Sequence, residues 1–294
     1  MPTAPAMKVL ITGAGGQVGR MLLETRPAEF EAIACTHGDL DIGAREAVRD
    51  CIAHHRPAVI INAAAYTAVD KAESEPDAAQ RINAEGPGHL AAAARRSGAR
   101  LIHISTDFVF DGAASVPYRP DSATSPLSVY GRTKRDGERA VLEALPENST
   151  IVRTAWVYAA TGANFVRTML RVMRANGSVR VVADQVGTPT AARFLAETLW
   201  RIAGAPEMRG IHHWTDAGVA SWYDFAVAIA EEGTALGLLP PDVTVTPIAT
   251  ADYPTPARRP SYSILDKRSL AAHGLAPVHW RQRLRAVLKE IPSA

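Results

Sequence analysis

The sequence predicts an α/β protein built on a doubly wound parallel sheet, with a smaller C-terminal substrate-binding part. Three observations predict this fold class. Short apolar runs alternate with amphipathic, alanine-rich stretches over the first half of the chain, and a glycine-rich loop directly follows the first run. After about residue 155, proline and glycine divide the chain into shorter elements. Strands that alternate with helices form right-handed βαβ units, which assemble into such a sheet.

Five apolar runs of strand length are bounded by turn residues. They are residues 8–12, 31–35, 59–62, 100–105 and 150–153. Val59, Ile60 and Ile61 are apolar at consecutive positions, which is typical of a parallel strand buried on both faces. Helical patterns lie between the runs, over residues 20–25 and 91–95. A further helix is predicted to begin near Ser74-Glu75-Pro76, with Ser74 as its cap and Pro76 in its first turn.

The chain is predicted to fold in two parts. Residues 1–155 form a dinucleotide-binding domain, and residues 156–294 form mainly a substrate domain with some segments that return to the first part. The later half carries the prolines of residues 187–190, 240–241 and 253–260. The sequence contains no fixed-period repeat and no low-complexity tract, so we expect an ordinary globular protein.

Composition excludes several classes of function. The 32 basic and 30 acidic residues give a formal net charge of +2, without the basic excess of a protein that binds nucleic acid polymers. No apolar run reaches the ~18 residues needed to cross a membrane, and the first residues do not resemble a signal peptide. Cys35 and Cys51 show no metal or redox spacing, which fits a reducing cytosol. Abundant alanine and the excess of arginine over lysine favour a bacterial source, so we expect a soluble, cytoplasmic bacterial protein.

The glycine-rich loop lies between the first predicted strand and a helical stretch. Its Gly-x-x-Gly-x-x-Gly pattern places glycines at Gly13, Gly16 and Gly19. Glycine permits positive φ, and its missing Cβ lets a pyrophosphate approach the backbone, while the next helix presents free N–H groups. The pattern alone also fits a plain tight turn. Its position after strand one favours a dinucleotide site and makes the predicted sheet Rossmann-like.

The end of the second predicted strand leaves the choice of dinucleotide open. Cys35-Thr36-His37-Gly38 contains no acid for a ribose 2′-hydroxyl and no arginine for a 2′-phosphate. Thr36 and His37 fit NADP and equally fit a surface turn, and Asp41 and Ile42 lie where they would flank an adenine. We therefore expect NADPH or NADH as cofactor, with NADPH slightly favoured.

A tyrosine and a lysine stand four residues apart, at Tyr130 and Lys134, and share one face if their segment is helical. A nearby ammonium favours phenolate and lowers the pKa of a tyrosine from about 10, so Tyr130 suits a general acid for a carbonyl that receives hydride. The fourth predicted strand ends in Ser105-Thr106-Asp107. Ligands of open α/β sheets bind beyond the carboxyl ends of strands, so these side chains are expected to face substrate. The same three residues also fit a turn or helix cap.

In this order, the loop, the strand end and the Tyr-x-x-x-Lys pattern resemble the extended branch of the short-chain dehydrogenase/reductase superfamily. The closer resemblance is to the dTDP-4-dehydrorhamnose reductases, and it spans nearly the whole chain. The matching stretches are residues 13–19, 62–73, 105–110, 130–134, 153–158, 164–165, 184–190 and 253–260. The Asn-Ala-Ala-Ala, Val-Asp-Lys-Ala-Glu and Pro-Ala-Arg-Arg-Pro stretches are more specific than the superfamily motifs.

The resemblance implies a catalytic role for Thr106, Tyr130 and Lys134 in reducing dTDP-4-dehydro-β-L-rhamnose to dTDP-β-L-rhamnose with NAD(P)H. Tyr130 would donate a proton to the C4 oxygen, Lys134 would hold the nicotinamide ribose and tune Tyr130, and Thr106 would orient the ketose. The implied cofactor-lining residues, besides Tyr130 and Lys134, are Gly13, Gly16, Gln17, Val18, Asp41, Ile42, Ala65, Tyr66 and Thr67. The family often has His where this chain has Tyr66. Trp156 matches a tryptophan that lies against the sugar, and Asp107 is also expected to bind substrate.

Several residues have two interpretations. Arg258 and Arg259, in a proline-rich segment, fit a nucleotide diphosphate or a structural ion pair with the first domain. Asn164 fits a substrate ligand or the cap of a helix over residues 165–173. His103 lies inside the fourth predicted strand and is expected to be a hydrogen-bonded sheet histidine rather than an acid. No carboxylates cluster at ligand spacing, so we expect no catalytic metal.

Two other functions remain compatible with the sequence. One is a non-catalytic dinucleotide-binding regulatory subunit of the methionine adenosyltransferase type, and the other is a nucleotide-sugar epimerase or dehydratase that retains NAD. The intact Thr106, Tyr130 and Lys134 favour the reductase. The expected partner is a nucleotide-sugar substrate, without nucleic acid polymer or membrane, and a homodimer is compatible with the sequence.

Overall fold

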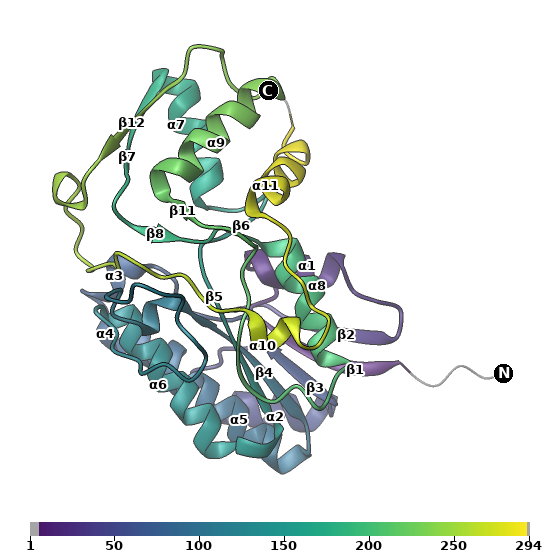
Figure 1. Ribbon diagram of the computed structural model, residues 1–294. Coiled ribbons are helices and arrows are strands. Elements are labelled where there is room, and N and C mark those ends of the chain that lie inside the picture. The colour runs from purple at the N-terminus through teal and green to yellow at the C-terminus, as the bar shows by residue number, and fades with distance from the viewer. Residues whose placement is uncertain (1–5, 293–294) are drawn as a thin grey trace.

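The computed structural model describes residues 6–292, which contain a central six-stranded parallel sheet (Figure 1). The strand order is β10-β5-β4-β3-β1-β2. The strands are β1 (Met7–Thr12), β2 (Phe30–Cys35), β3 (Val59–Asn62), β4 (Arg100–Thr106), β5 (Ser149–Thr154) and β10 (Gly210–His213). All neighbours pair in parallel, which confirms the predicted Rossmann-like fold class. The five predicted strands agree with the observed bounds to within one residue at each end.

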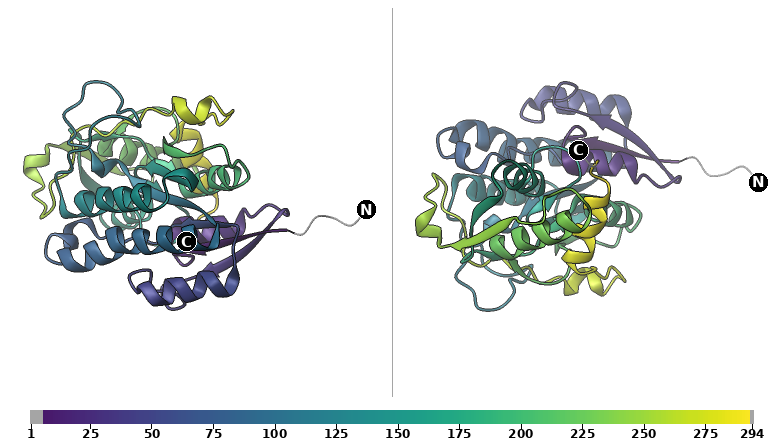
Figure 2. Two further views of the ribbon diagram at one scale, coloured as in Figure 1. Left: turned by 90° about the horizontal axis from the view of Figure 1, so that it is seen from below. Right: turned by 90° about the horizontal axis from the view of Figure 1, so that it is seen from above.

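Helices cover both faces of the sheet (Figure 2). One face packs on α1 (Gln17–Glu24) and α8 (Ala192–Ala203), and the other packs on α2 (Arg45–His55), α5 (Gly86–Ser97) and α6 (Val129–Ala144). Side chains of β3 alternate between these layers, because Ile61 belongs to the first apolar cluster and Ile60 to the second. Burial on both faces explains why the strand is apolar at consecutive positions.

The residues after β5 build most of a second lobe, which lies above the sheet in Figure 1. Its helices are α7 (Phe165–Asn176), α9 (Trp222–Ala235) and α11 (Trp280–Lys289). Its paired strands are β6 (Val157–Tyr158) with β9 (Thr190–Ala191), β7 (Ser178–Val182) with β12 (Thr244–Ile248), and β8 (Val186–Gly187) with β11 (Ala220–Ser221). The lobe has its own apolar core, whereas α8 and β10 pack with the sheet.

Short helices fill the connections. They are α3 (Val69–Ala72), α4 (Pro76–Gln80), the π-helix η1 (Arg81–Glu85), the 3₁₀ turns η2 (Asp107–Val109), η3 (Pro146–Asn148) and η4 (Thr250–Asp252), and α10 (Arg268–Ala271). None of the helices described between residues 6 and 292 is long and apolar enough to cross a membrane.

Two helix starts differ from the prediction. The first helix begins at Gln17 rather than at residue 20, so the glycine loop leads into it without a spacer. The predicted cap of α4 is wrong, because Glu75 precedes this helix and the Ser74 hydroxyl donates to the carbonyl of Lys71 at 3.0 Å. Pro76 does occupy the first turn, where its missing N–H costs no helical hydrogen bond.

Candidate functional site

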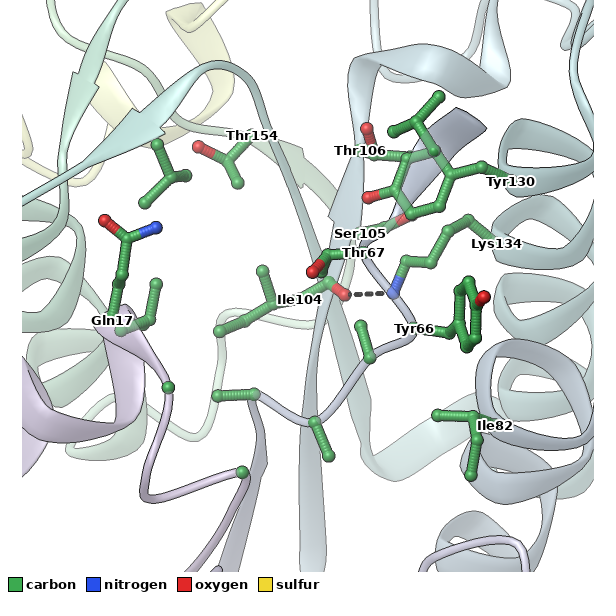
Figure 3. Close-up of a pocket in the computed structure, with 18 of the residues that line it drawn as sticks. Gln17, Tyr66, Thr67, Ile82, Ile104, Ser105, Thr106, Tyr130, Lys134 and Thr154 are labelled. Carbon is green, nitrogen blue, oxygen red and sulfur yellow. Dashed lines mark hydrogen bonds between the residues drawn. The ribbon is translucent and has the colours of Figure 1, made fainter. Parts of the chain in front are cut away.

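A cavity of about 900 Å³ lies where the carboxyl ends of β1, β3, β4 and β5 meet the C-terminal lobe (Figure 3). The residues expected at the site that line it are Gly13, Gly16, Gln17, Val18, Ile42, Ala65, Tyr66, Thr67, Thr106, Asp107, Tyr130, Lys134, Trp156 and Arg259. Three others, Asp41, Asn164 and Arg258, are not part of the wall formed by the described residues. The fold thus brings most of the expected residues to one cavity.

The glycine loop forms one end of this cavity. Gly13 has a φ of +68°, and a Cβ at this position would lie 2.6 Å from the backbone nitrogen of Ala64. The loop closes through a hydrogen bond from Gly16 N to Gly13 O at 2.9 Å, and Ala14 N donates to Cys35 O at 3.1 Å. A tight backbone cradle at a helix start, with unpaired N–H groups, suits a pyrophosphate.

The segment after β3 forms the adjacent wall and is held at both ends. Asn62 accepts hydrogen bonds through Oδ1 from Thr12 Oγ1 at 2.7 Å and from Ala64 N at 3.1 Å. Asn83 in η1 clamps the other end, accepting from Tyr66 N at 2.8 Å and donating to Tyr66 O at 3.0 Å. The Tyr66 hydroxyl donates to Glu75 at 2.7 Å, so this hydroxyl is already engaged outside the catalytic group.

Tyr130 and Lys134 lie on α6, which begins beside the end of β4. The Ser128 side chain caps the helix by accepting from Gly131 N at 3.1 Å. A Cβ at Gly131 would lie 2.2 Å from the carbonyl oxygen of Phe108, so only glycine lets α6 approach η2 this closely. The approach places the Tyr130 ring beside Thr106, with Gln17 across the cavity (Figure 3).

Burial raises the pKa of Tyr130 to about 12, with the Thr106 hydroxyl opposing this effect and Asp107 adding to it. The expectation that Lys134 lowers the pKa of Tyr130 is therefore wrong for this structure. Lys134 Nζ turns to the carbonyl of Ile104 and donates to it at 2.7 Å. Burial also lowers the pKa of Lys134 to about 8, against the charge of Glu138. At neutral pH the phenol keeps its proton, as a general acid must.

Three buried polar atoms at this end lack a hydrogen-bond partner among residues 6–292. They are Ser105 Oγ, Asp107 Oδ2 and Thr154 Oγ1, all from residues that line the cavity. The Thr106 hydroxyl donates to the other carboxylate oxygen of Asp107 at 3.0 Å. Burial raises the pKa of Asp107 to about 6, although the hydroxyls of Ser263 and Thr106 oppose the shift. Orphaned polar atoms at a cavity are what a ligand rich in hydroxyls would satisfy.

Two stacked indole rings line the cavity from the lobe side. Trp156 has a φ of +49°, an uncommon conformation for a bulky side chain, and its ring lies 3.5 Å from that of Trp222 at an angle of 9°. The sequence reasoning missed Trp222. The capping box of Ser221 and Asp224 signals a helix start at this position, but nothing in the sequence indicates which surface the Trp222 ring faces.

The remaining expected residues have visible structural partners or lie apart. Asp41 accepts from Arg81 at 2.6 Å. Asn164 caps α7 by accepting from Arg167 N at 3.1 Å. Arg259 forms a two-pronged ion pair with Asp70, with N–O distances of 2.7 and 3.0 Å, and also lines the cavity. Arg258 is exposed and forms no hydrogen bond or ion pair with the described part of the chain.

The sequence reasoning left out Arg81 of η1, which lines the cavity near the glycine loop. Its place depends on a chain crossing that no local pattern reveals. His37, which follows β2 and whose sequence context fits NADP or a surface turn, lines the same wall. Within residues 6–292, no group of three or more His, Cys, Asp or Glu side chains is arranged to hold a metal ion.

Known proteins resemble this chain over nearly its whole length. The model of the RmlD substrate binding domain family matches residues 7–293. A dTDP-4-dehydrorhamnose reductase of Streptomyces griseus is 46% identical over 292 residues, which cover 97% of this chain and 94% of that protein. A crystal structure of a dTDP-4-dehydrorhamnose reductase from Clostridium acetobutylicum has a TM-score of 0.91 and 42% identity, and covers 97% of this chain and 99% of that one. The enzyme of the same name from Bacillus anthracis, in complex with NADP, has a TM-score of 0.91, 36% identity and the same coverage.

Proposed function

The chain belongs to the RmlD substrate binding domain family, and from this premise we propose that it is an NAD(P)H-dependent reductase of a nucleotide sugar. It reduces the C4 ketone of dTDP-4-dehydro-β-L-rhamnose and yields dTDP-β-L-rhamnose. The observation that carries the proposal is the meeting of Thr106, Tyr130 and Lys134 at the cavity beside the glycine loop. A dinucleotide cradle without these three side chains would support binding alone.

One end of the cavity fits a nicotinamide dinucleotide. The backbone of Gly13 and Gly16 and the first N–H groups of α1 would hold the pyrophosphate, and Lys134 would hold the nicotinamide ribose. When bound, the cofactor supplies the hydride that C4 receives. Arg81 and His37 add basic groups to the wall, which supports a slight preference for NADPH although Arg81 is paired with Asp41.

The other end supplies the proton and orients the ketone. Tyr130 holds its proton at neutral pH and donates it to the C4 oxygen as that oxygen gains negative charge. Thr106, beside the phenol, would hold the same oxygen in reach (Figure 3). Trp156 offers a flat apolar face to the sugar, and Arg259 offers a cation to the diphosphate.

Two other functions fit the sequence less well once relatives are considered. A regulatory subunit of the methionine adenosyltransferase type needs no proton donor, and an epimerase or dehydratase regenerates its bound NAD. Several relatives that span the chain at over 40% identity are named dTDP-4-dehydrorhamnose reductase, which supports reduction over both alternatives.

The test is turnover of the purified protein with the 4-dehydro sugar nucleotide and NADPH, followed by the loss of cofactor absorbance. Cofactor should be consumed in equal amount to product. Tyr130→Phe should lower kcat by about 10²- to 10⁴-fold and leave NADPH binding nearly unchanged.

Tyr66→Phe is the matched control, because Tyr66 lines the same cavity with its hydroxyl tied to Glu75. Its kcat should stay within a few-fold of the unaltered enzyme. Product formation without cofactor consumption would indicate an epimerase, and normal turnover by Tyr130→Phe would remove Tyr130 as the proton donor.

We also propose that the protein works in the cytoplasm as a homodimer, with a dinucleotide part over residues 1–155 and mainly a sugar-nucleotide part over residues 156–294. The free thiols of Cys35 and Cys51 support a reducing compartment, and the separate apolar cores of sheet and lobe support the division. Light scattering tests the dimer, and a particle of 31.4 kDa would contradict it.

A further inference from the structure

A buried line of polar side chains runs beneath the cavity from β1 to α6. Its members are Thr12, Asn62, His103 and Lys134, each at most 2% exposed. Thr12 Oγ1 lies 2.7 Å from Asn62 Oδ1, Asn62 Nδ2 lies 3.0 Å from His103 Nδ1, and His103 Nε2 lies 3.4 Å from Lys134 Nζ. The line ends on a side chain that the proposed reaction uses, although His103 itself does not line the cavity formed by the described residues.

The orientation of the Asn62 amide is fixed by the backbone. Ala64 N lies 3.1 Å from Asn62 Oδ1, and a backbone N–H can only donate. The oxygen of the amide must therefore face Ala64, and the NH₂ group must face His103. Since an amide NH₂ has no lone pair to offer, His103 Nδ1 accepts this hydrogen bond.

This acceptor role fixes the tautomer of His103. Burial and the charge of Lys134 keep the pKa of His103 well below its usual value, so the ring is neutral and holds one proton. With Nδ1 as acceptor, the proton is on Nε2, and the Nε2–H is directed at the nitrogen of Lys134. A neutral amine has a lone pair that can accept this bond, whereas an ammonium group has none.

We propose that His103 is a positioning residue that acts through Lys134 by stabilising its neutral amine. The catalytic meaning of this role rests on the proposed reductase function. Tyr130 gives its proton to the C4 oxygen, and a proton from the Lys134 ammonium restores the phenol. The amine that remains accepts the Nε2–H of His103 until solvent returns a proton to Lys134. His103 keeps its own proton throughout, so the net proton comes from solvent.

The other polar groups around Lys134 do not favour its neutral amine over its ammonium form. On α6, Glu138 raises the pKa of Lys134, but Arg153 of β5 holds both Glu138 oxygens at 2.8 and 2.7 Å. On η2, Asp107 accepts the Thr106 hydroxyl. The carbonyl of Ile104 accepts from Nζ whether Lys134 is charged or neutral. The Nε2–H of His103 is the contact that distinguishes the two forms.

The first test reads the tautomer directly in the unaltered protein. In ¹⁵N-histidine NMR, with the His103 signals assigned through a His103→Gln variant, Nε2 should be protonated and Nδ1 should be bare. A proton on Nδ1, or a doubly protonated ring at neutral pH, would overturn the proposal. The variant serves only to identify the His103 signals, and the tautomer itself is measured in the unaltered protein.

The second test is the titration of Lys134 in the full chain without cofactor or substrate. The chain has five lysines, Lys8, Lys71, Lys134, Lys267 and Lys289, so their side-chain signals can be assigned by substitution. The Lys134 midpoint should lie near pH 8 and rise by about one unit in His103→Leu, because one net hydrogen bond changes an equilibrium about tenfold. His103→Gln keeps an acceptor for Asn62 and a donor for Lys134, and should titrate close to the unaltered protein. A midpoint that His103→Leu leaves unmoved contradicts the proposal.

The third test is the pH profile of ketone reduction. In His103→Leu, the alkaline midpoint of the kcat profile should move to higher pH by about one pH unit. At neutral pH, kcat should fall by about tenfold, with KM little changed. His103→Gln should restore both. If kcat falls but the alkaline midpoint does not change, His103 contributes only through packing, and the proposal is wrong. Absence of ketone reduction in every form would refute the proposed function and leave the tautomer and the Lys134 titration to be decided separately.

Discussion

The two ends of the cavity are built in different ways. The dinucleotide end is formed mainly by backbone from two short continuous segments, the glycine loop and the turn after β3. The other end consists of side chains from segments far apart in the chain, namely Thr106, Tyr130, Trp156, Trp222 and Arg259. A backbone site depends on where a Cβ cannot fit, whereas a side-chain site depends on burial, charge and the partners of each group. Substitutions should therefore fail for different reasons at the two ends.

The largest effect on stability and cofactor binding is expected at the backbone end, from Gly13→Ala. The change puts a Cβ 2.6 Å from Ala64 N at a φ of +68°. Left-handed backbone costs about 1–2 kcal/mol and overpacking about 1–3 kcal/mol, so the free energy of unfolding should fall by about 2–5 kcal/mol. NADPH affinity should fall by about 10- to 100-fold. Urea unfolding and cofactor fluorescence measure the two quantities.

Gly15→Ala is the matched control in the same loop. A Cβ at Gly15 would meet only the Thr36 methyl group, at 3.8 Å, and this glycine does not have positive φ. Its stability and NADPH affinity should stay near those of the unaltered protein. Equal losses in the two variants would mean that the loop needs flexibility rather than space, and the comparison of the two ends would lose its basis.

The same contrast explains how much the sequence could predict. The sheet and the glycine loop follow from local patterns, because burial on both faces and missing Cβ atoms leave their mark on consecutive residues. Trp222 and Arg81 reach the cavity only through packing of distant segments, so no local pattern indicates them. The expected effect of Lys134 on the pKa of Tyr130 was wrong because spacing along a helix does not tell that Lys134 turns to Ile104. Spacing predicts which residues share a face, and burial decides their charge.

At the side-chain end, Asp107 should make stability depend on pH. Burial raises its folded pKa to about 6 from the ordinary 3.8, so the folded state binds this proton more tightly than the unfolded state. Below about pH 4, Asp107 is protonated in both the folded and the unfolded state, and its ionisation does not lower the free energy of unfolding. As pH rises through about 6, the folded chain bears a buried charge, and stability falls by at most ~3 kcal/mol. Urea unfolding between pH 4 and 7 measures this slope.

Asp107→Asn should remove that part of the slope, because an amide does not titrate in this range. The Asn side chain can still accept from the Thr106 hydroxyl. The difference in unfolding free energy between the two proteins should therefore change with pH in this window and be constant above about pH 7. A constant difference throughout would show that Asp107 is ionised with its ordinary pKa in the folded protein.

Trp222 should affect sugar binding more than cofactor binding. Its ring stacks on Trp156 and keeps that ring in place, although Trp156 has a positive φ. In Trp222→Ala, the KM for the sugar nucleotide should rise about tenfold, since the stack and its buried surface are worth about 1–2 kcal/mol. NADPH affinity should stay nearly constant. Trp222→Phe retains a ring, so its KM for the sugar nucleotide should return most of the way to that of the unaltered protein. If Trp222→Ala weakens the binding of the sugar nucleotide and of NADPH equally, Trp222 does not belong to the sugar end.

The smallest effect is expected from two neighbouring arginines, which separate a ligand role from a structural one. Arg259 lines the cavity and is held by Asp70, whereas Arg258 is exposed. Arg259→Met removes a cation from the cavity, so the KM for the sugar nucleotide should rise several-fold, up to about tenfold, and less steeply at high salt. Arg258→Met should change KM by less than about twofold.

Asp70→Asn decides which contact of Arg259 matters. This change weakens the ion pair but leaves the guanidinium in the chain, so a purely structural role predicts that Asp70→Asn and Arg259→Met lower stability alike, without a change in KM. A diphosphate role predicts a KM that responds to Arg259→Met and hardly to Asp70→Asn. The ion pair is partly exposed, with 24% of the Arg259 side chain and 41% of the Asp70 side chain accessible, so its own contribution to stability should be about 1 kcal/mol or less. Because stability changes little in either case, the KM for the sugar nucleotide distinguishes the two roles. If Arg259→Met changes stability but not this KM, Arg259 does not bind the substrate, and the sugar end consists of the residues of β4, α6 and the tryptophan pair.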